Sequence, residues 1–239
     1  MKKHLFNTIL CSLCLTLFSS CASHYWDLRQ ESSLSEILTK VNNWDPYFQA
    51  VLGWGYYEGV LGKIDLEKAY LLFKASSEAG HPLGDFFLAN LYWTGKGVVI
   101  DRKKAYGLVL RSMNGIQALA TQGDLYACFA VGKMFQFGMV VPVDYISSKE
   151  WYLKAAEKGF PAAQTNLGYL YVKGLGVEMD YTLARYWFEK AAFQGHAIGQ
   201  FNLGYFFQKG MGGYENMAEA AKWFEKADAQ GYSGDINFD

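Results

Sequence analysis

The side chains that could support catalysis or bind a metal are few and scattered along this 239-residue chain. Two of its four histidines, His81 and His196, occupy the same position of a repeating pattern described below, so stacked repeats would hold them apart. The acidic residues form no pair beyond those that the starts of predicted helices explain. Since a metal site needs several converging ligands, we expect no metal, no cofactor and no catalytic residue.

Two glycine-rich segments are similar in composition to loops that bind phosphate groups. They are Gly95-Lys96-Gly97 and Gly174-Leu175-Gly176. A phosphate-binding loop follows a strand and opens a helix, whereas these segments follow predicted helices. We therefore interpret them as turns.

The composition indicates a folded protein with no affinity for nucleic acid. Hydrophobic residues make up 51% of the chain and charged residues 19%, which excludes a disordered, charge-dominated sequence. The chain has 22 Lys and Arg against 23 Asp and Glu. A nucleic-acid binder needs a basic face that neutralises phosphates, and this balance predicts none.

Residues 1–20 are predicted to be a leader peptide. Two lysines precede an apolar run from Leu5 to Phe18, which is shorter than the roughly 20 residues that span a bilayer and fits a secretory signal. The small residues before Cys21 resemble the lipobox of bacterial lipoproteins. The resemblance implies cleavage before Cys21, a lipid on its thiol and, with Ala22 next, an outer-membrane lipoprotein in the cell envelope, facing the periplasm. Ordinary cleavage near Ser23 is the alternative.

The rest of the chain consists of five copies of one unit. A glycine recurs at steps of 36, 43, 36 and 36 residues, with a small residue six positions before it, an aromatic residue three before it, and Asp or Asn six after it. The recurring glycines are Gly59, Gly95, Gly138, Gly174 and Gly210. A second glycine closes each unit, at Gly80, Gly123, Gly159, Gly195 and Gly231.

These positions predict a pair of helices in each unit. The first helix ends at the recurring glycine, which can adopt a left-handed conformation, and Asp or Asn then caps the second helix. One such pair cannot bury its own apolar face, so neighbouring units must stack into an all-α solenoid. The second unit has seven additional residues near 114–120, which either extend its second helix by two turns or break it at Gly115.

The fourth unit carries a resemblance to a known family most clearly. It reads Ala163-Gln164-x-Asn166-Leu167-Gly168-x-x-Tyr171-x-x-Gly174-x-Gly176-Val177-x-x-Asp180, then Ala184, Trp187-Phe188-x-Lys190-Ala191-Ala192 and Gly195. This pattern resembles the Sel-1-like repeat family, over residues 47–232. The resemblance implies a right-handed superhelix of helix pairs, related in shape to tetratricopeptide repeats, that binds other proteins.

The flanking segments complete the predicted domain organisation. Residues 21–46 are predicted to be a tether followed by one capping helix, in which Ser33 and Glu36 have capping-box spacing. Residues 233–239 are a short tail. Cys128 lies in an apolar helical stretch, and we expect it to be a buried hydrophobic residue.

One stripe of each first helix is variable in sequence and is predicted to line a concave, partner-binding face. Tyr and Trp are favoured anchors at interfaces, although the same aromatic residues could instead pack between units. The predicted face comprises Trp54, Tyr57, Phe87, Asn90, Trp93, Lys133, Asn166, Tyr169, Asn202 and Tyr205.

The sequence therefore predicts a non-catalytic, protein-binding module that meets the membrane only through its lipid anchor. One interpretation is an envelope adaptor or scaffold that holds a partner protein in its concave groove. The alternative is an immunity protein, because lipoproteins with these repeats look like those that neutralise secreted phospholipase toxins. An enzyme is the third hypothesis, and the scattered reactive side chains argue against it.

Overall fold

The computed structural model describes residues 45–59 and 63–234, which belong to one compact unit, Trp44–Asp239. The predicted leader, Cys21, the capping helix and most of the tail lie outside the described residues. The described part contains ten α-helices and no strand. They are α4 (Pro46–Tyr57), α5 (Leu66–Glu78), α6 (Pro82–Thr94), α7 (Arg102–Thr121), α8 (Leu125–Phe137), α9 (Tyr145–Glu157), α10 (Pro161–Lys173), α11 (Tyr181–Phe193), α12 (Ala197–Lys209) and α13 (Met217–Asp228).

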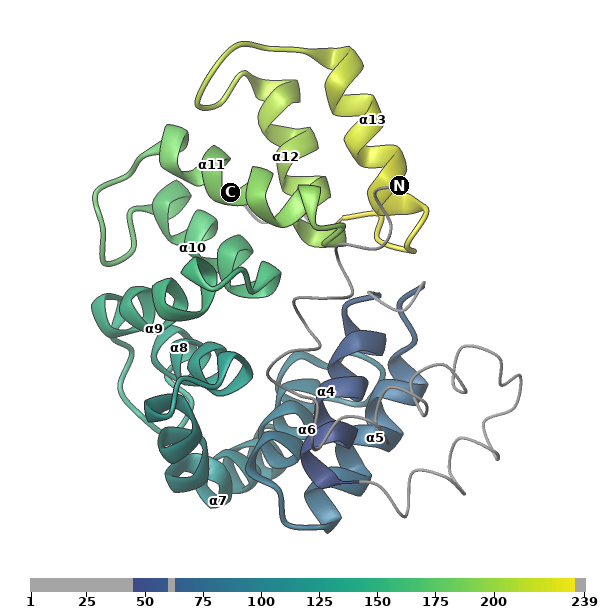
Figure 1. Ribbon diagram of the computed structural model, residues 1–239, viewed down its shortest axis with the longest axis vertical. Helices are drawn as coiled ribbons and strands as arrows, with labels where there is room; N and C mark the ends of the chain where they lie inside the picture. Colours follow the sequence, from purple (N-terminus) through teal and green to yellow (C-terminus); the bar gives the residue numbers. More distant parts are fainter. Residues whose placement is uncertain (1–44, 60–62, 235–239) are drawn as a thin grey trace, which may run out of the picture. The chain divides into compact units, whose positions relative to one another are not determined.

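The helices form five antiparallel pairs stacked along an arc (Figure 1). The first helices of the pairs, α4, α6, α8, α10 and α12, are called the inner helices. Among them, α4 contacts α6, α6 contacts α8, and α10 contacts α12. The second helices, α5, α7, α9, α11 and α13, are the outer helices and pack mainly on their inner neighbours. This arrangement confirms the predicted all-α solenoid of five repeats.

The helix boundaries follow from the capping residues that the sequence repeats. Gly174 ends α10 in the left-handed conformation, at φ 65°, where a side chain would be strained. The Asp180 carboxylate then accepts hydrogen bonds from the backbone N–H groups of Thr182 and Leu183, at 2.8 and 2.9 Å. Pro161 occupies the first turn of α10, where its missing N–H costs little. The predicted caps are therefore confirmed.

Within a pair, a glycine of the inner helix lies against an aromatic ring of the outer helix. A Cβ atom at Gly168 would lie 2.7 Å from the Phe188 ring, and one at Gly132 would lie 2.6 Å from Tyr152. Gly53 and Gly204 face Phe73 and Phe224 in the same way. The rings of Phe73, Tyr152 and Phe188 are fully buried. Among the tryptophans of the outer helices, Trp223 is buried, whereas Trp151 and Trp187 are half-buried.

The second repeat departs from this pattern in two ways. Ala89 replaces the glycine and Val109 replaces the ring, and both residues are fully buried, so a smaller outer side chain accompanies a larger inner one. The additional residues extend α7 to 20 residues, against 13 in α9 and α11. The helix continues through Gly115, whose missing side chain admits Pro82, since a Cβ there would lie 2.8 Å from the proline ring.

The glycine–aromatic contact can be tested by placing the alanine and the valine of the second repeat at the corresponding two positions of the fourth. We expect Gly168→Ala to lower the free energy of unfolding by about 1–3 kcal/mol, because the new methyl group overpacks the Phe188 ring. Adding Phe188→Val should recover part of that loss, so that the double variant is about 1 kcal/mol more stable than the sum of the single variants predicts. Denaturant unfolding measures all three.

Gly107→Ala is the matched control for this series. Gly107 lies in α7, and a Cβ there would meet no atom within 4 Å. Alanine should therefore stabilise the helix by about 0.5–1 kcal/mol. Strictly additive effects of Gly168→Ala and Phe188→Val would contradict the packing argument.

Candidate partner-binding face

The predicted partner-binding residues divide into a buried group and a half-buried group. Trp54, Tyr57, Phe87 and Asn90 are buried, with at most 8% of each residue exposed. The half-buried group comprises Trp93, Lys133, Asn166, Tyr169, Asn202 and Tyr205. Partner binding by this set of residues stays a prediction.

Trp54 lies at the centre of an aromatic cluster that joins the first three repeats and reaches the start of the fourth. Its ring centroid lies 4.7 Å from that of Phe87 on α6 and 5.0 Å from that of Phe129 on α8. It also lies 6.2 Å from that of Phe160, the residue that precedes α10. Trp54 and Phe87 thus pack between units, which is the alternative that the sequence left open, and their side chains are not exposed to a partner here. The concave side is filled here because α4 places a large ring where several inner helices converge.

A buried polar contact joins the first repeat to the last two. The Nε2 atom of His196, which precedes α12, meets the Glu58 carboxylate, which follows α4. The Nδ1 atom of His196 accepts the backbone N–H of Gly199 at 3.1 Å and lies 2.9 Å from the Thr165 hydroxyl. Since Nδ1 is an acceptor, the geometry assigns the ring proton to Nε2, which donates it to Glu58.

The surroundings of Glu58 keep its carboxyl group ionised despite its burial. Burial raises the pKa of Glu58, but His196 and then Lys96 and Lys133 more than offset this effect, so the pKa lies below its usual value. A buried carboxylate needs such partners, because removing one from water without compensation is very costly. Glu58 and His196 are separated by 138 positions in the sequence, so their contact fixes how far the solenoid curves.

Lys133 and Asn90 extend this polar cluster across the inner helices. The Lys133 ammonium donates to the Asn90 side-chain oxygen at 2.6 Å, and the Asn90 amide donates to the Tyr57 hydroxyl at 3.3 Å. Lys96, just after α6, lies with its nitrogen 5.1 Å from the centre of the Tyr57 ring. Three predicted residues, Tyr57, Asn90 and Lys133, are therefore brought together. The sequence did not predict that Glu58, Lys96 and His196 would join them.

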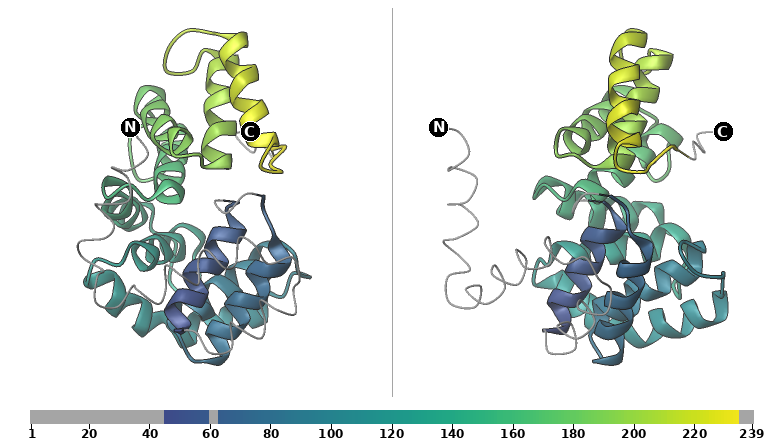
Figure 2. Two further views of the ribbon diagram at one scale, coloured as in Figure 1. Left: turned by 45° about the vertical axis from the view of Figure 1, so that its right-hand side comes forward. Right: turned by 90° about the vertical axis from the view of Figure 1, so that its right-hand side faces the viewer.

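Further contacts hold the two ends of the arc close to each other. The backbone N–H of Ile64, in the first repeat, donates to the carbonyl of Gln230, in the last, at 3.3 Å. The Tyr47 hydroxyl of α4 donates to the Asp124 carboxylate that caps α8, at 2.7 Å, and so ties the first repeat to the middle of the arc. Both views of Figure 2 show the first pair (blue) beside the end of the last pair (yellow). Contacts between the first repeat and later repeats therefore fill part of the inner face.

The remaining predicted residues lie along the inner helices away from the Trp54 cluster. Asn166 and Tyr169 are on α10, and Asn202 and Tyr205 are at the equivalent positions of α12. Burial raises the pKa of Tyr169. Trp93 is separate from them, and the Arg102 guanidinium stacks over its ring at 4.3 Å. The Tyr and Asn pairs thus form the part of the predicted face that stays partly exposed.

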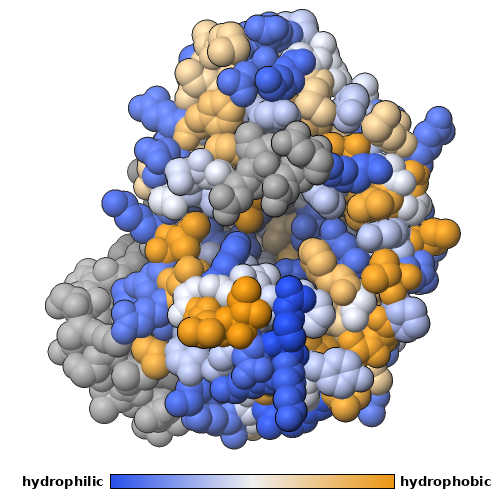
Figure 3. Space-filling model, turned by 180° about the vertical axis from the view of Figure 1, so that it is seen from behind, coloured by the Kyte–Doolittle hydropathy of each residue, from blue (hydrophilic) through white to orange (hydrophobic). Residues whose placement is uncertain are grey.

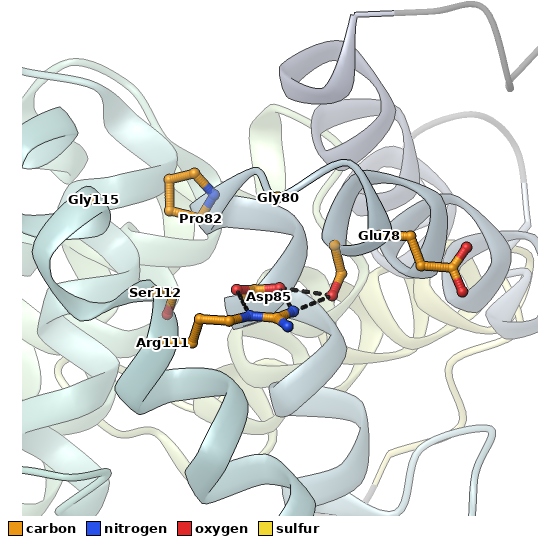
Figure 4. Close-up of a pocket in the computed structure, with 8 residues that line it drawn as sticks. Glu78, Gly80, Pro82, Asp85, Arg111, Ser112 and Gly115 are labelled. Atoms are coloured by element: carbon orange, nitrogen blue, oxygen red, sulfur yellow. Dashed lines mark hydrogen bonds and ion pairs between the residues drawn. The ribbon is translucent and has the colours of Figure 1, made fainter.

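The second repeat also holds an ion pair beside a pocket of about 270 Å³ (Figure 4). Arg111 of α7 binds the buried Asp85 carboxylate of α6, with Nε to Oδ2 at 2.6 Å, and the Ser77 hydroxyl donates to Asp85 at 2.6 Å. Arg111 stands where the fourth repeat has Lys190. The pocket arises where Gly115 and Pro82 approach each other, a feature that sequence reasoning missed.

Neither a metal-binding cluster nor a membrane-spanning helix occurs in the described part of the chain. Over residues 45–59 and 63–234, no group of three or more His, Cys, Asp or Glu side chains could hold a metal ion. In the same residues, no helix is both long enough and apolar enough to cross a bilayer. Cys128 is buried, as expected, and burial raises the pKa of its thiol.

The contact between Glu58 and His196 predicts a pH-dependent contribution to stability. Glu58→Gln should lower the free energy of unfolding at pH 7 by about 1–3 kcal/mol, because it leaves a buried polar contact incomplete. The folded-state pKa of Glu58 is lowered, so the stabilisation is present above its unfolded value, about 4.3, and is lost as the pH falls below it. Urea unfolding of both proteins at pH 7 and pH 3.5 measures this difference.

Glu225→Gln, on the exposed side of α13, is the control for the loss of a charge. It should change stability by less than about 0.5 kcal/mol. A Glu58→Gln difference that is as large at pH 3.5 as at pH 7 would contradict the ionised Glu58 described here.

Comparison with known proteins supports the repeat architecture. A Sel1 repeat protein from Oxalobacter formigenes is 29% identical in sequence, with a TM-score of 0.50, and the match covers 79% of this chain and 74% of that one. Chitin synthase regulatory factor 3 of Schizosaccharomyces pombe is 28% identical over 120 residues, which is half of this chain and 12% of that relative. An immunity protein from Pseudomonas aeruginosa matches at 20% identity and a TM-score of 0.43, covering 78% of this chain and 84% of its own.

The five repeats can also be compared directly with a family model. The Sel1 repeat model matches residues 46–81, 82–112, 125–160, 161–196 and 197–232. The match omits residues 113–124, which include the extra turns of α7. The matched segments make up more than half of the chain and coincide with the five helix pairs. The chain belongs to the Sel1 repeat family.

Proposed function

We propose that this protein is a non-catalytic interaction module that binds a partner protein on the inner face of its solenoid. The Sel1 repeat fold is that of an interaction scaffold, and solenoids of stacked repeats use extended concave surfaces for binding. The observation that carries the proposal is the pairing of Tyr and Asn at equivalent positions of α10 and α12. Asn166 and Asn202 supply hydrogen-bonding groups, and Tyr169 and Tyr205 supply aromatic surface.

The location of these residues makes α10 and α12 the favoured part of the face. The inner aromatic residues of the first repeats are buried in the Trp54 cluster. The Tyr and Asn residues of α10 and α12, in contrast, are half-buried. Seen from the side opposite Figure 1, the surface is hollowed near its middle and carries hydrophobic and hydrophilic residues interspersed (Figure 3). A partner therefore meets a mixed polar and aromatic surface.

We further infer where the protein resides in the cell. The leader at residues 1–20 and the lipobox-like residues before Cys21 support a lipid-anchored protein of the outer membrane, facing the periplasm. The module would then act as an envelope adaptor or scaffold. An immunity protein that neutralises a secreted phospholipase toxin is the alternative, and the identity of the partner decides between them.

Affinity capture from native membranes, followed by mass spectrometry, tests the proposed face. We expect Tyr169→Ala combined with Tyr205→Ala to reduce recovery of the stoichiometric partner by about tenfold or more, since interface tyrosines are frequent hot spots. Because Tyr205 also packs against the core of the last repeats, Asn166→Ala with Asn202→Ala provides a second variant. Circular dichroism checks that each variant retains its helices.

The matched control is Tyr186→Ala combined with Tyr214→Ala, which removes two tyrosines that are 47% and 72% exposed. It should leave recovery unchanged. Unchanged recovery by folded variants of α10 and α12 would refute the proposed face. Several envelope proteins among the partners would support the adaptor, whereas a single secreted enzyme that loses activity on binding would establish the immunity function in its place.

A further inference from the structure

We propose that Lys96 and Lys133 form a carboxylate-binding site on the inner face, which receives an acidic side chain of the partner. This inference rests on the proposed protein-binding function and specifies the chemistry of the partner. It concerns neither the tyrosines nor the asparagines of α10 and α12. The experiments below can therefore refute one proposal without refuting the other.

The inner helices carry an excess of positive charge. Within their described ranges, the charged residues are Asp85, Lys133, Lys173 and Lys209. Asp85 is already bound by Arg111 of α7. The outer helices, in contrast, mix both signs, as in the paired Arg185 and Glu189 of α11. Lys173 and Lys209 are the last residues of α10 and α12, so Lys133 is the lysine of these helices that meets the polar cluster around Glu58. Together with Lys96, it gives this cluster a basic character that is complementary to an acidic partner.

Lys96 and Lys133 are linked through the contact between Tyr57 and Asn90: the Lys96 nitrogen lies 5.1 Å from the centre of the Tyr57 ring, and Lys133 donates to Asn90. Burial and then the positive charge of Lys96 lower the pKa of Lys133 to about 8, and Glu58 opposes this shift. Glu58 is the neighbouring carboxylate, but it already accepts the Nε2 proton of His196. Two ammonium groups therefore share one carboxylate that is already engaged. A second carboxylate would restore the charge balance.

The two lysines differ in exposure in a way that suits a ligand arriving from solvent. Lys96 is exposed, whereas Lys133 is half-buried behind it and donates one hydrogen bond to Asn90. An ammonium group has three donors, so Lys133 keeps donors for a ligand. The Phe129 and Phe137 rings lie 5.7 and 5.4 Å from its nitrogen and limit the water around it. A carboxylate placed between the two lysines would form charge-assisted hydrogen bonds, which are stronger than neutral ones.

Binding of a labelled hexaglutamate peptide to the full chain, followed by fluorescence anisotropy at low salt, tests the site. Hexaglutamine is the uncharged control peptide. We expect Lys133→Gln and Lys96→Gln each to weaken hexaglutamate binding by roughly tenfold. Lys222→Gln, which removes an exposed lysine of α13, should change it by less than about twofold.

The pH dependence of the wild-type protein provides a second measurement that needs no variant. A bound carboxylate stabilises charged Lys133, so its pKa rises on binding and affinity falls as the pH increases through about 8. The groups that face Lys133 are Asn90, Lys96 and Glu58, with His196 behind Glu58. Hexaglutamate should therefore bind more weakly at pH 9 than at pH 7, and Lys133→Gln should largely remove this difference.

Equal binding of hexaglutamate and hexaglutamine would overturn the proposed site. An equal loss of hexaglutamate binding in Lys222→Gln and Lys133→Gln would also overturn it.

Capture of the partner from membranes separates the two proposals. If the partner is retained by Lys96→Gln and Lys133→Gln but lost by the Tyr169 and Tyr205 variants, the carboxylate-binding site is wrong and the protein-binding function stands. If the lysine variants lose hexaglutamate while the tyrosine and asparagine variants retain the partner, the site stands and the proposed face on α10 and α12 is wrong.

Discussion

The contact of the first inner helix with the later repeats determines what the inner face can bind. In a solenoid, each repeat needs only its neighbours to bury its apolar surface. Here α4 reaches further, because Trp54 packs against Phe129 and Phe160 and Glu58 meets His196. These contacts fill part of the concave side and curve the arc until its ends approach each other. A partner can therefore contact only those residues of the inner face that are not engaged in these contacts.

Most of the fold follows from local sequence features that recur from repeat to repeat. Left-handed glycines, Asp and Asn caps and early prolines are each effective within a few residues, and their repetition at a constant spacing locates every helix pair. The close approach of Gly168 to Phe188 is equally local, since both belong to one pair. The length of the insertion before Gly123 was also informative, because seven residues are two helical turns. The continuous α7 agrees with that periodicity, and Gly115 did not break the helix.

The candidate site was less predictable, because it depends on the angle that accumulates between repeats. The positions of Trp54, Phe87 and Asn90 within the repeat predicted that they lie on the inner side. No position within a repeat shows how near the first repeat comes to the fourth. That distance decides whether Trp54 is an exposed anchor or a buried packing residue. In the structure Trp54 is a buried packing residue. Glu58 and Lys96 lie at helix ends and His196 is a helix cap. Their meeting depends on long-range geometry, and a single copy of the repeat contains no signal for it.

The closure of the arc also connects stability with binding. Lys133 is half-buried because the closed arc surrounds it, and the same closure brings Lys96 and Glu58 close enough to affect its pKa. In a chain with an open arc these lysines would be more hydrated, and a carboxylate would bind them more weakly. The polar cluster and the Trp54 cluster therefore position the groups that we assign to recognition, in addition to stabilising the fold.

A double-mutant cycle between Glu58→Gln and His196→Asn tests the closure most directly. Asparagine can still cap α12, so the cycle isolates the contact between the two side chains. If Glu58 and His196 are in direct contact, we expect a coupling free energy of about 1 kcal/mol or more in denaturant unfolding at pH 7. A coupling within about 0.3 kcal/mol of zero would show that the first repeat and the last two do not meet, and would contradict the closed arc.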